Sequence, residues 1–197
     1  MRALLRLSRS IDRMNERVGA ALSWIVLIAV FVSAGTATAR KAFDVSSNGL
    51  LEIQWYLFAA MFLLAAGYTM LRQEHVRIDV LLGRFARRTQ VKVEIFGIVV
   101  FLFPFVAVMI GLVLPLVVRA FATGEISSNE GGLIRWPVYA LVPIGFLLLG
   151  LQGVSELVKR VAFLLGMIDD PASRRGQKSA EEELAEALRA QRDEATR

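Results

Sequence analysis

The stretch that decides the fold runs from Glu52 to Asp79 and reads E-I-Q-W-Y-L-F-A-A-M-F-L-L-A-A-G-Y-T-M-L-R-Q-E-H-V-R-I-D. Its central part, from Ile53 to Leu71, contains no charged residue. A helix of that length, at about 1.5 Å of rise per residue, approaches the roughly 30 Å thickness of a bilayer's hydrocarbon core. The stretch therefore predicts a membrane-spanning helix.

Aromatic and ionisable residues mark both ends of this span, and such residues are typical of membrane interfaces. A second tryptophan, Trp136, stands at the start of a later apolar run. These interface positions supply the candidates for contact with a partner or with lipid: Glu52, Trp55, Arg72, His75, Arg77, Asp79 and Trp136.

Each candidate also has a simpler interpretation. Glu52 is either solvated, which the residues alone favour, or paired with Arg40, Lys41 or a cation of a partner. The two tryptophans are better explained as interface anchors than as ligand groups. The basic residues Arg72, His75 and Arg77 suit phospholipid phosphate, and His75 has the alternative of bonding to a neighbouring helix.

The composition assigns the chain to a membrane. Of 197 residues, 55% are hydrophobic, and the mean hydropathy is +0.53, too apolar for a soluble domain. The formal net charge is +5, and the basic residues lie beside apolar runs. This placement favours contact with a membrane surface over contact with nucleic acid. Since there is no cysteine, disulfides and thiolate metal sites are excluded.

The predicted fold is all-α, with four transmembrane helices in one domain over residues 18–168. An arginine every three or four residues predicts an amphipathic surface helix over 1–17. The first apolar run is too long for the core of a cleaved signal peptide.

A second surface helix is expected between spans two and three, beginning near Asp79, and residues 169–197 form a polar tail, either partly helical or disordered. The spans are predicted at about 18–39, 53–71, 95–118 and 136–166, with Pro104 and Pro115 kinking the third.

The distribution of lysine and arginine predicts the orientation. Five precede the first span, six follow the second, and eight lie from Lys159 onward, whereas the other two loops hold two each. By the positive-inside rule, both termini are cytoplasmic.

Two loops resemble each other at an offset of 81 residues. Ser46-Ser47-Asn48 matches Ser127-Ser128-Asn129, and Trp55 matches Trp136. A parallel repeat of two hairpins explains this echo about as well as shared interface chemistry does.

The sequence offers no chemistry of its own. One histidine, His75, cannot provide bis-histidine haem ligation, and no nucleophile elbow or P-loop is present. The span cores are uncharged, so no ion pathway is indicated, and Gln54 and Gln152 are expected to form hydrogen bonds between helices. We therefore expect neither an enzyme nor a cofactor-binding chain.

The second predicted span opens with an acidic residue and a tryptophan and is followed by His-Val-Arg-Ile-Asp at 75–79. In these residues the chain resembles the small membrane subunit of tripartite ATP-independent periplasmic (TRAP) transporters. The resemblance covers Val18 to about Gly166. It implies a multi-pass protein of the bacterial inner membrane, a large multi-span permease subunit and a periplasmic substrate-binding protein as partners, and a sodium gradient that drives import of organic acids. The chain would brace the permease and help dock the binding protein. The alternative is a membrane anchor that tethers a soluble enzyme or signalling complex through the tail.

Overall fold

The computed structural model describes residues 2–44, 47–72 and 85–168. These residues fold almost entirely as helices, and their β-structure is limited to one isolated bridge between Ile126 and Ile134. The predicted tail, 169–197, and the loop with His75, Arg77 and Asp79 lie outside the described residues. The helical segments are α1 (Arg2–Phe43), α2 (Asn48–Arg72), α4 (Arg87–Gly97), the π-helix η1 (Ile98–Leu102), α5 (Phe103–Thr123) and α6 (Trp136–Leu164).

Four helical stretches of the described chain are long and apolar enough to cross a membrane, which confirms the predicted number of spans. They are α1, α2, the continuous run from Arg87 to Thr123, and α6. The first three extend beyond the predicted spans at both ends, because polar turns continue each helix past its apolar core. The fourth, α6, ends two residues before the predicted end at 166.

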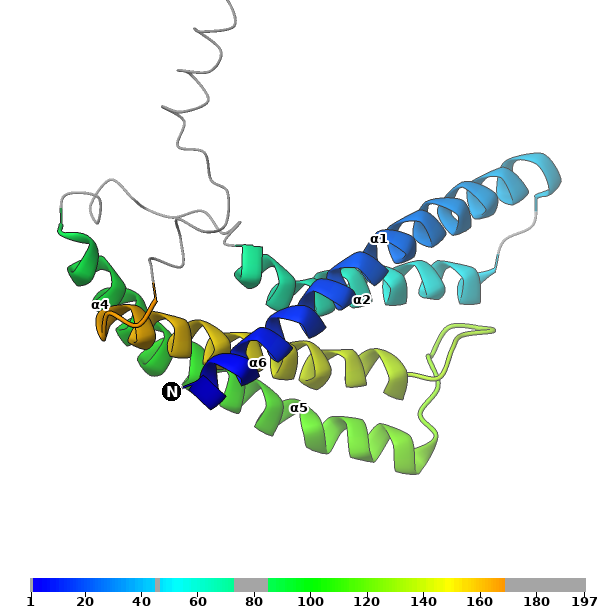
Figure 1. The fold of residues 1–197 in the computed structure, drawn as a ribbon. Coiled ribbons are helices and arrows are strands. Elements are labelled where there is room, and N and C mark those ends of the chain that lie inside the picture. Colours follow the sequence, from blue (N-terminus) through cyan, green and yellow to red (C-terminus); the bar gives the residue numbers. More distant parts are fainter. Residues whose placement is uncertain (1, 45–46, 73–84, 169–197) are drawn as a thin grey trace, which may run out of the picture.

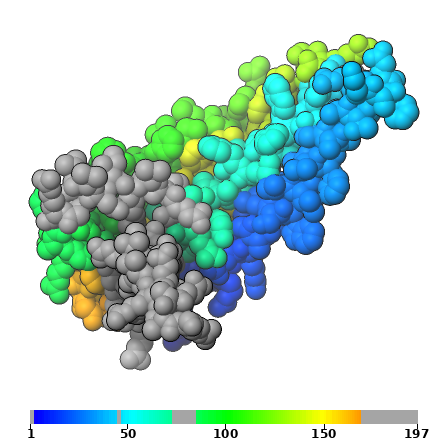
Figure 2. Space-filling view, turned by 90° about the horizontal axis from the view of Figure 1, so that it is seen from above, coloured from blue at the N-terminus to red at the C-terminus, as the bar shows by residue number. Residues whose placement is uncertain are grey.

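The helices form a bundle in which α6 contacts α1, α2, α4 and α5 (Figure 1). In the space-filling view, α2 lies between α1 on one side and the α5 and α6 pair on the other (Figure 2). The helices α2 and α6 approach closely at Gly145, where a Cβ atom would lie 2.6 Å from the backbone oxygen of Leu63. Small residues allow such close packing between membrane helices.

The bundle has two chemically distinct ends. The "loop end" is the end where α1 is followed by α2 and α5 is joined to α6 by residues 124–135 (Figure 1). The "basic end" is the opposite one, where α1 begins and α2 and α6 end, with Arg72, Lys159 and Arg160.

The first helix differs from the prediction of a separate surface helix over 1–17. Residues 2–43 form one uninterrupted helix of 42 residues, which at about 1.5 Å per residue is twice as long as a hydrocarbon core is thick. Its first turns pack against the bundle, because Ser8, Ile11 and Asn15 are buried there. The arginines of this segment are exposed, so they lie outside the buried stripe that packs on the other helices: Arg6, Arg9, Arg13 and Arg17.

A π-helix accommodates Pro104 in the third span. The backbone N–H of Phe103 bonds to the oxygen of Ile98, five residues back, and Pro104 follows directly. Proline lacks an N–H and its ring collides with the preceding turn, so a wider turn relieves the collision. Most of the surface helix expected before this span lies outside the described residues, and its last arginines, Arg87 and Arg88, begin α4.

The predicted orientation can be tested with single cysteines, because the chain has none of its own. We expect Ser47→Cys and Ser128→Cys to react with a membrane-impermeant maleimide added from the periplasm. Ala86→Cys and Ala180→Cys should react only after the membrane is opened. Labelling of Ala86→Cys in intact spheroplasts would contradict the positive-inside assignment.

Candidate functional site

The connection between α5 and α6 is a structured hairpin at the loop end. The N–H of Ser127 donates to the oxygen of Leu133 at 2.9 Å, and the N–H of Arg135 donates to the oxygen of Glu125 at 2.9 Å. Gly131 has a φ of 70°, in the region that favours glycine. At Gly132 a Cβ atom would lie 2.6 Å from that of Ser127. The Gly131-Gly132 pair therefore permits this tight turn.

Glu52, in the second turn of α2, fastens this hairpin to the bundle. Its carboxylate accepts hydrogen bonds from the backbone N–H of Leu133 at 2.7 Å and from Asn129 Nδ2 at 2.8 Å, and a third, short one from the Ser127 hydroxyl. A carboxylate that accepts bonds from a backbone N–H and two side chains holds all three groups in one geometry. Glu52 is thus neither simply solvated nor paired with Arg40 or Lys41 in the described structure.

Three further contacts tie α2 to the same hairpin. Asn48 Nδ2 donates to the backbone oxygen of Glu130 at 3.1 Å, and the Tyr56 hydroxyl donates to that of Ile134 at 3.0 Å. Gly49 comes so close that its Cβ atom would lie 3.0 Å from the oxygen of Gly131. The asparagines of the two similar loops, Asn48 and Asn129, therefore both bond across the junction between the loops.

A cavity of about 480 Å³ opens beside this junction, between α2 and the start of α6. Its lining combines charged, aromatic and apolar groups, among them Glu52, Trp55, Tyr56, Arg135 and Tyr139. The Arg135 guanidinium lies 3.5 Å from a Glu125 oxygen and 3.4 Å from the Tyr139 hydroxyl. The bond to Tyr139 and the nearby carboxylates raise the pKa of Arg135 above its ordinary value, so the group stays charged.

The remaining predicted candidates lie in different places. The Trp55 side chain is 74% exposed, consistent with an interface anchor, and Trp136 packs edge to face on Phe121 at 5.4 Å between ring centroids. Arg72, at the basic end, donates to the Tyr68 hydroxyl at 3.1 Å. The structure therefore brings Glu52 and Trp55 to one cavity and leaves Arg72 at the other end of α2.

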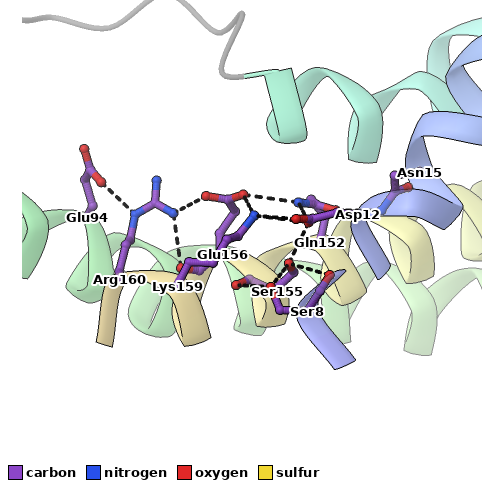
Figure 3. A network of polar contacts seen from close by, with 9 residues as sticks. All are labelled: Ser8, Asp12, Asn15, Glu94, Gln152, Ser155, Glu156, Lys159 and Arg160. Carbon is purple, nitrogen blue, oxygen red and sulfur yellow. Dashed lines mark hydrogen bonds and ion pairs between the residues drawn. The ribbon is translucent and has the colours of Figure 1, made fainter. Parts of the chain in front are cut away.

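Sequence reasoning missed a second polar cluster, at the basic end (Figure 3). Asp12 of α1 accepts from Lys159 Nζ at 3.1 Å with both oxygens, from Ser155 Oγ at 2.7 Å and from Gln152 Nε2 at 3.0 Å. We call this cluster the basic-end network. It consists of Ser8, Asp12, Asn15, Glu94, Gln152, Ser155, Glu156, Lys159 and Arg160.

The network continues through α6 to α4. Glu156 is fully buried, contacts Lys159, and lies 2.5 Å from Arg160 Nη1. Arg160 Nε in turn lies 2.6 Å from a Glu94 oxygen. Buried charges are tolerated only when they are paired, so this chain of ion pairs fixes how α1, α6 and α4 pack.

The two span glutamines bond between helices, as predicted. Gln54 accepts from Ser33 Oγ at 3.0 Å, which joins α2 to α1. Gln152 accepts from Asn15 Nδ2 at 2.8 Å, which joins α6 to α1 within the basic-end network. Among the described residues, no group of three or more His, Cys, Asp or Glu side chains is arranged to hold a metal ion.

These features define a multi-pass membrane protein whose helices are joined by polar contacts at both ends. The family model for the DctQ component of tripartite ATP-independent periplasmic transporters matches residues 36–163. The chain belongs to this family, the small component of TRAP transporters. No curated protein and no solved structure matches the chain. The family is a non-enzymatic transport subunit that works with a large permease and a periplasmic binding protein.

Proposed function

We propose that this chain is the scaffold subunit of a sodium-coupled, binding-protein-dependent transporter that imports organic acids across the bacterial inner membrane. In this role it braces the large permease and helps to dock the periplasmic binding protein. The family assignment supports the tripartite complex. The docking role is supported by the loop end, and the bracing role by the basic-end network.

The observation that carries the docking role is the attachment of the hairpin 124–135 to α2 by Glu52. A docking surface binds more tightly when its loops are ordered before the partner arrives, since less conformational entropy is lost. Glu52 orders the hairpin from within one subunit. The neighbouring cavity, with Trp55 exposed beside Arg135, then has a defined shape.

The bracing role is supported by the polar contacts that join the helices to one another. The basic-end network joins α1 and α4 to α6 by ion pairs, while Gln54 joins α1 to α2. Both α1 and α5 carry exposed apolar side chains, such as Phe31 and Leu112, which are available for contact with a larger membrane subunit.

The docking role predicts that Glu52→Lys lowers substrate uptake by the complete complex several-fold, without lowering membrane insertion. The substitution removes the acceptor for three donors of the hairpin and places a cation among them. Uptake should be measured in proteoliposomes as a function of the concentration of loaded binding protein. We expect the loss to appear mainly as a weaker apparent affinity for the binding protein and to change with salt.

The matched control is Glu130→Lys, which makes the same charge change in the hairpin that Glu52 holds. Glu130 is exposed, and the contact that it makes to α2 uses its backbone oxygen, not its carboxylate. This variant should retain most of the uptake. Normal uptake by Glu52→Lys at all salt concentrations would contradict the docking role, and equal losses in both variants would show that charge, and not loop order, matters.

A further inference from the structure

An apolar groove of about 430 Å³ lies at the basic end, separate from the loop-end cavity. Its apolar wall includes Met70 of α2, Leu102 of η1, Phe105 of α5 and Leu149 of α6. Two charged residues, Glu94 and Arg160, also line it. The groove therefore combines an apolar body with a charged end at the boundary of the membrane-spanning helices.

Arg160 is the group in this groove with unused bonding capacity. The residue is only 6% exposed. Its Nε donates to Glu94 at 2.6 Å and its Nη1 to Glu156 at 2.5 Å, whereas Nη2 makes no hydrogen bond to any described residue. In Figure 3 this third nitrogen points away from both carboxylates. A guanidinium held by two carboxylates, with one N–H₂ group left to donate, is positioned to receive one more acceptor.

We propose that this groove binds one phospholipid, with a phosphate oxygen at Arg160 Nη2 and an acyl chain along the apolar wall. The chemistry favours this occupant because an arginine donates readily to phosphate, while the wall offers only apolar contacts. A phospholipid carries both groups in one molecule, and the bilayer supplies it at the depth of the groove. The bound lipid would fill the space between α2, η1 and α6.

Gly97 provides a way to fill the groove without touching the charges. It lines the groove, and a Cβ atom added there would meet nothing within 4 Å. Gly97→Leu should therefore fold and place its side chain where the acyl chain lies. Gly111→Leu is the matched control, because Gly111 of α5 also has nothing within 4 Å but is not among the residues that line the groove.

The test is native mass spectrometry of the full chain after detergent delipidation, with phosphatidylethanolamine or phosphatidylglycerol added back. We expect one lipid to be retained by the unaltered chain and by Gly111→Leu. Gly97→Leu should weaken retention at least tenfold, and excess inorganic phosphate should not displace the lipid. A circular dichroism melt verifies that both variants fold.

Three results would overturn the proposal. The first is an unaltered chain that retains no lipid. The second is retention by Gly97→Leu equal to that of Gly111→Leu. The third is displacement of the lipid by inorganic phosphate alone, which would make this a site for a free anion. If Gly97→Leu instead abolished co-purification of the large permease while lipid retention stayed unchanged, the groove would be a protein interface.

Discussion

Lys159→Met is expected to destabilise the helix bundle by about 3 to 5 kcal/mol, the usual cost of removing one partner from a buried ion pair. Lys159 is 9% exposed, and its ammonium group contacts Asp12 and the fully buried Glu156. Methionine keeps most of the side-chain volume but leaves two carboxylates facing each other without the cation between them. The measurement is the free energy of unfolding in mixed micelles, followed by circular dichroism as the denaturing detergent is increased.

Lys92→Met is the matched control, because Lys92 lies at the same end of the bundle on an exposed face of α4. It should change stability by less than about 0.5 kcal/mol. The double variant Asp12→Leu, Lys159→Met should recover part of the loss, since it removes the Asp12 carboxylate that has lost the Lys159 cation, while Glu156 keeps its ion pair with Arg160. A loss below about 1 kcal/mol for Lys159→Met would show that the network does not hold α1 to α6.

The four spans were predictable because they depend on a property that each segment has by itself. An uncharged run long enough to cross a bilayer can be counted from the sequence, and the helices in the structure contain all four runs. The family was likewise indicated by local residues, the acidic residue and tryptophan that open the second span and the stretch 75–79, and the family model confirms it.

The basic-end network was not predictable in the same way, because its members are far apart in the chain. Ser8 and Asp12 lie beside arginines, so the segment was interpreted as an amphipathic helix on the membrane surface. Their partners are more than 100 residues away, on α6. One signal was present: Ser8, Asp12 and Asn15 repeat at four and three residues, and Gln152, Ser155 and Lys159 repeat at three and four. Matching polar stripes on two helices indicate a contact between them.

The partners of Glu52 were missed for a related reason. The sequence placed it at the interface and suggested nearby cations, but its donors come from a loop about 80 residues further along the chain. One of them, the backbone N–H of Leu133, carries no sequence signature at all. Only the Gly131-Gly132 pair indicated that this loop turns tightly.

The last prediction is that the chain is required for transport but supplies no coupling-ion site. Reconstituted without the large permease, it should accumulate neither an organic acid nor sodium in liposomes, and its omission from the complex should abolish uptake. The physical reason lies in the basic-end network, where carboxylate oxygens of Asp12 and Glu156 converge. A cation site needs such convergence, but here the Lys159 ammonium already occupies the space between them.

The ratio of sodium to substrate, measured by reversal potential in proteoliposomes of the complete complex, checks this role. Glu52→Gln, Asp12→Asn and Glu156→Gln should each lower the rate or the yield of complex, because each weakens a contact that orders the scaffold. None should change the ratio, since the ions that accompany the substrate would bind in the large permease. A changed ratio in Asp12→Asn or Glu156→Gln would place a coupling ion at the basic end and assign this chain an active part in energy coupling.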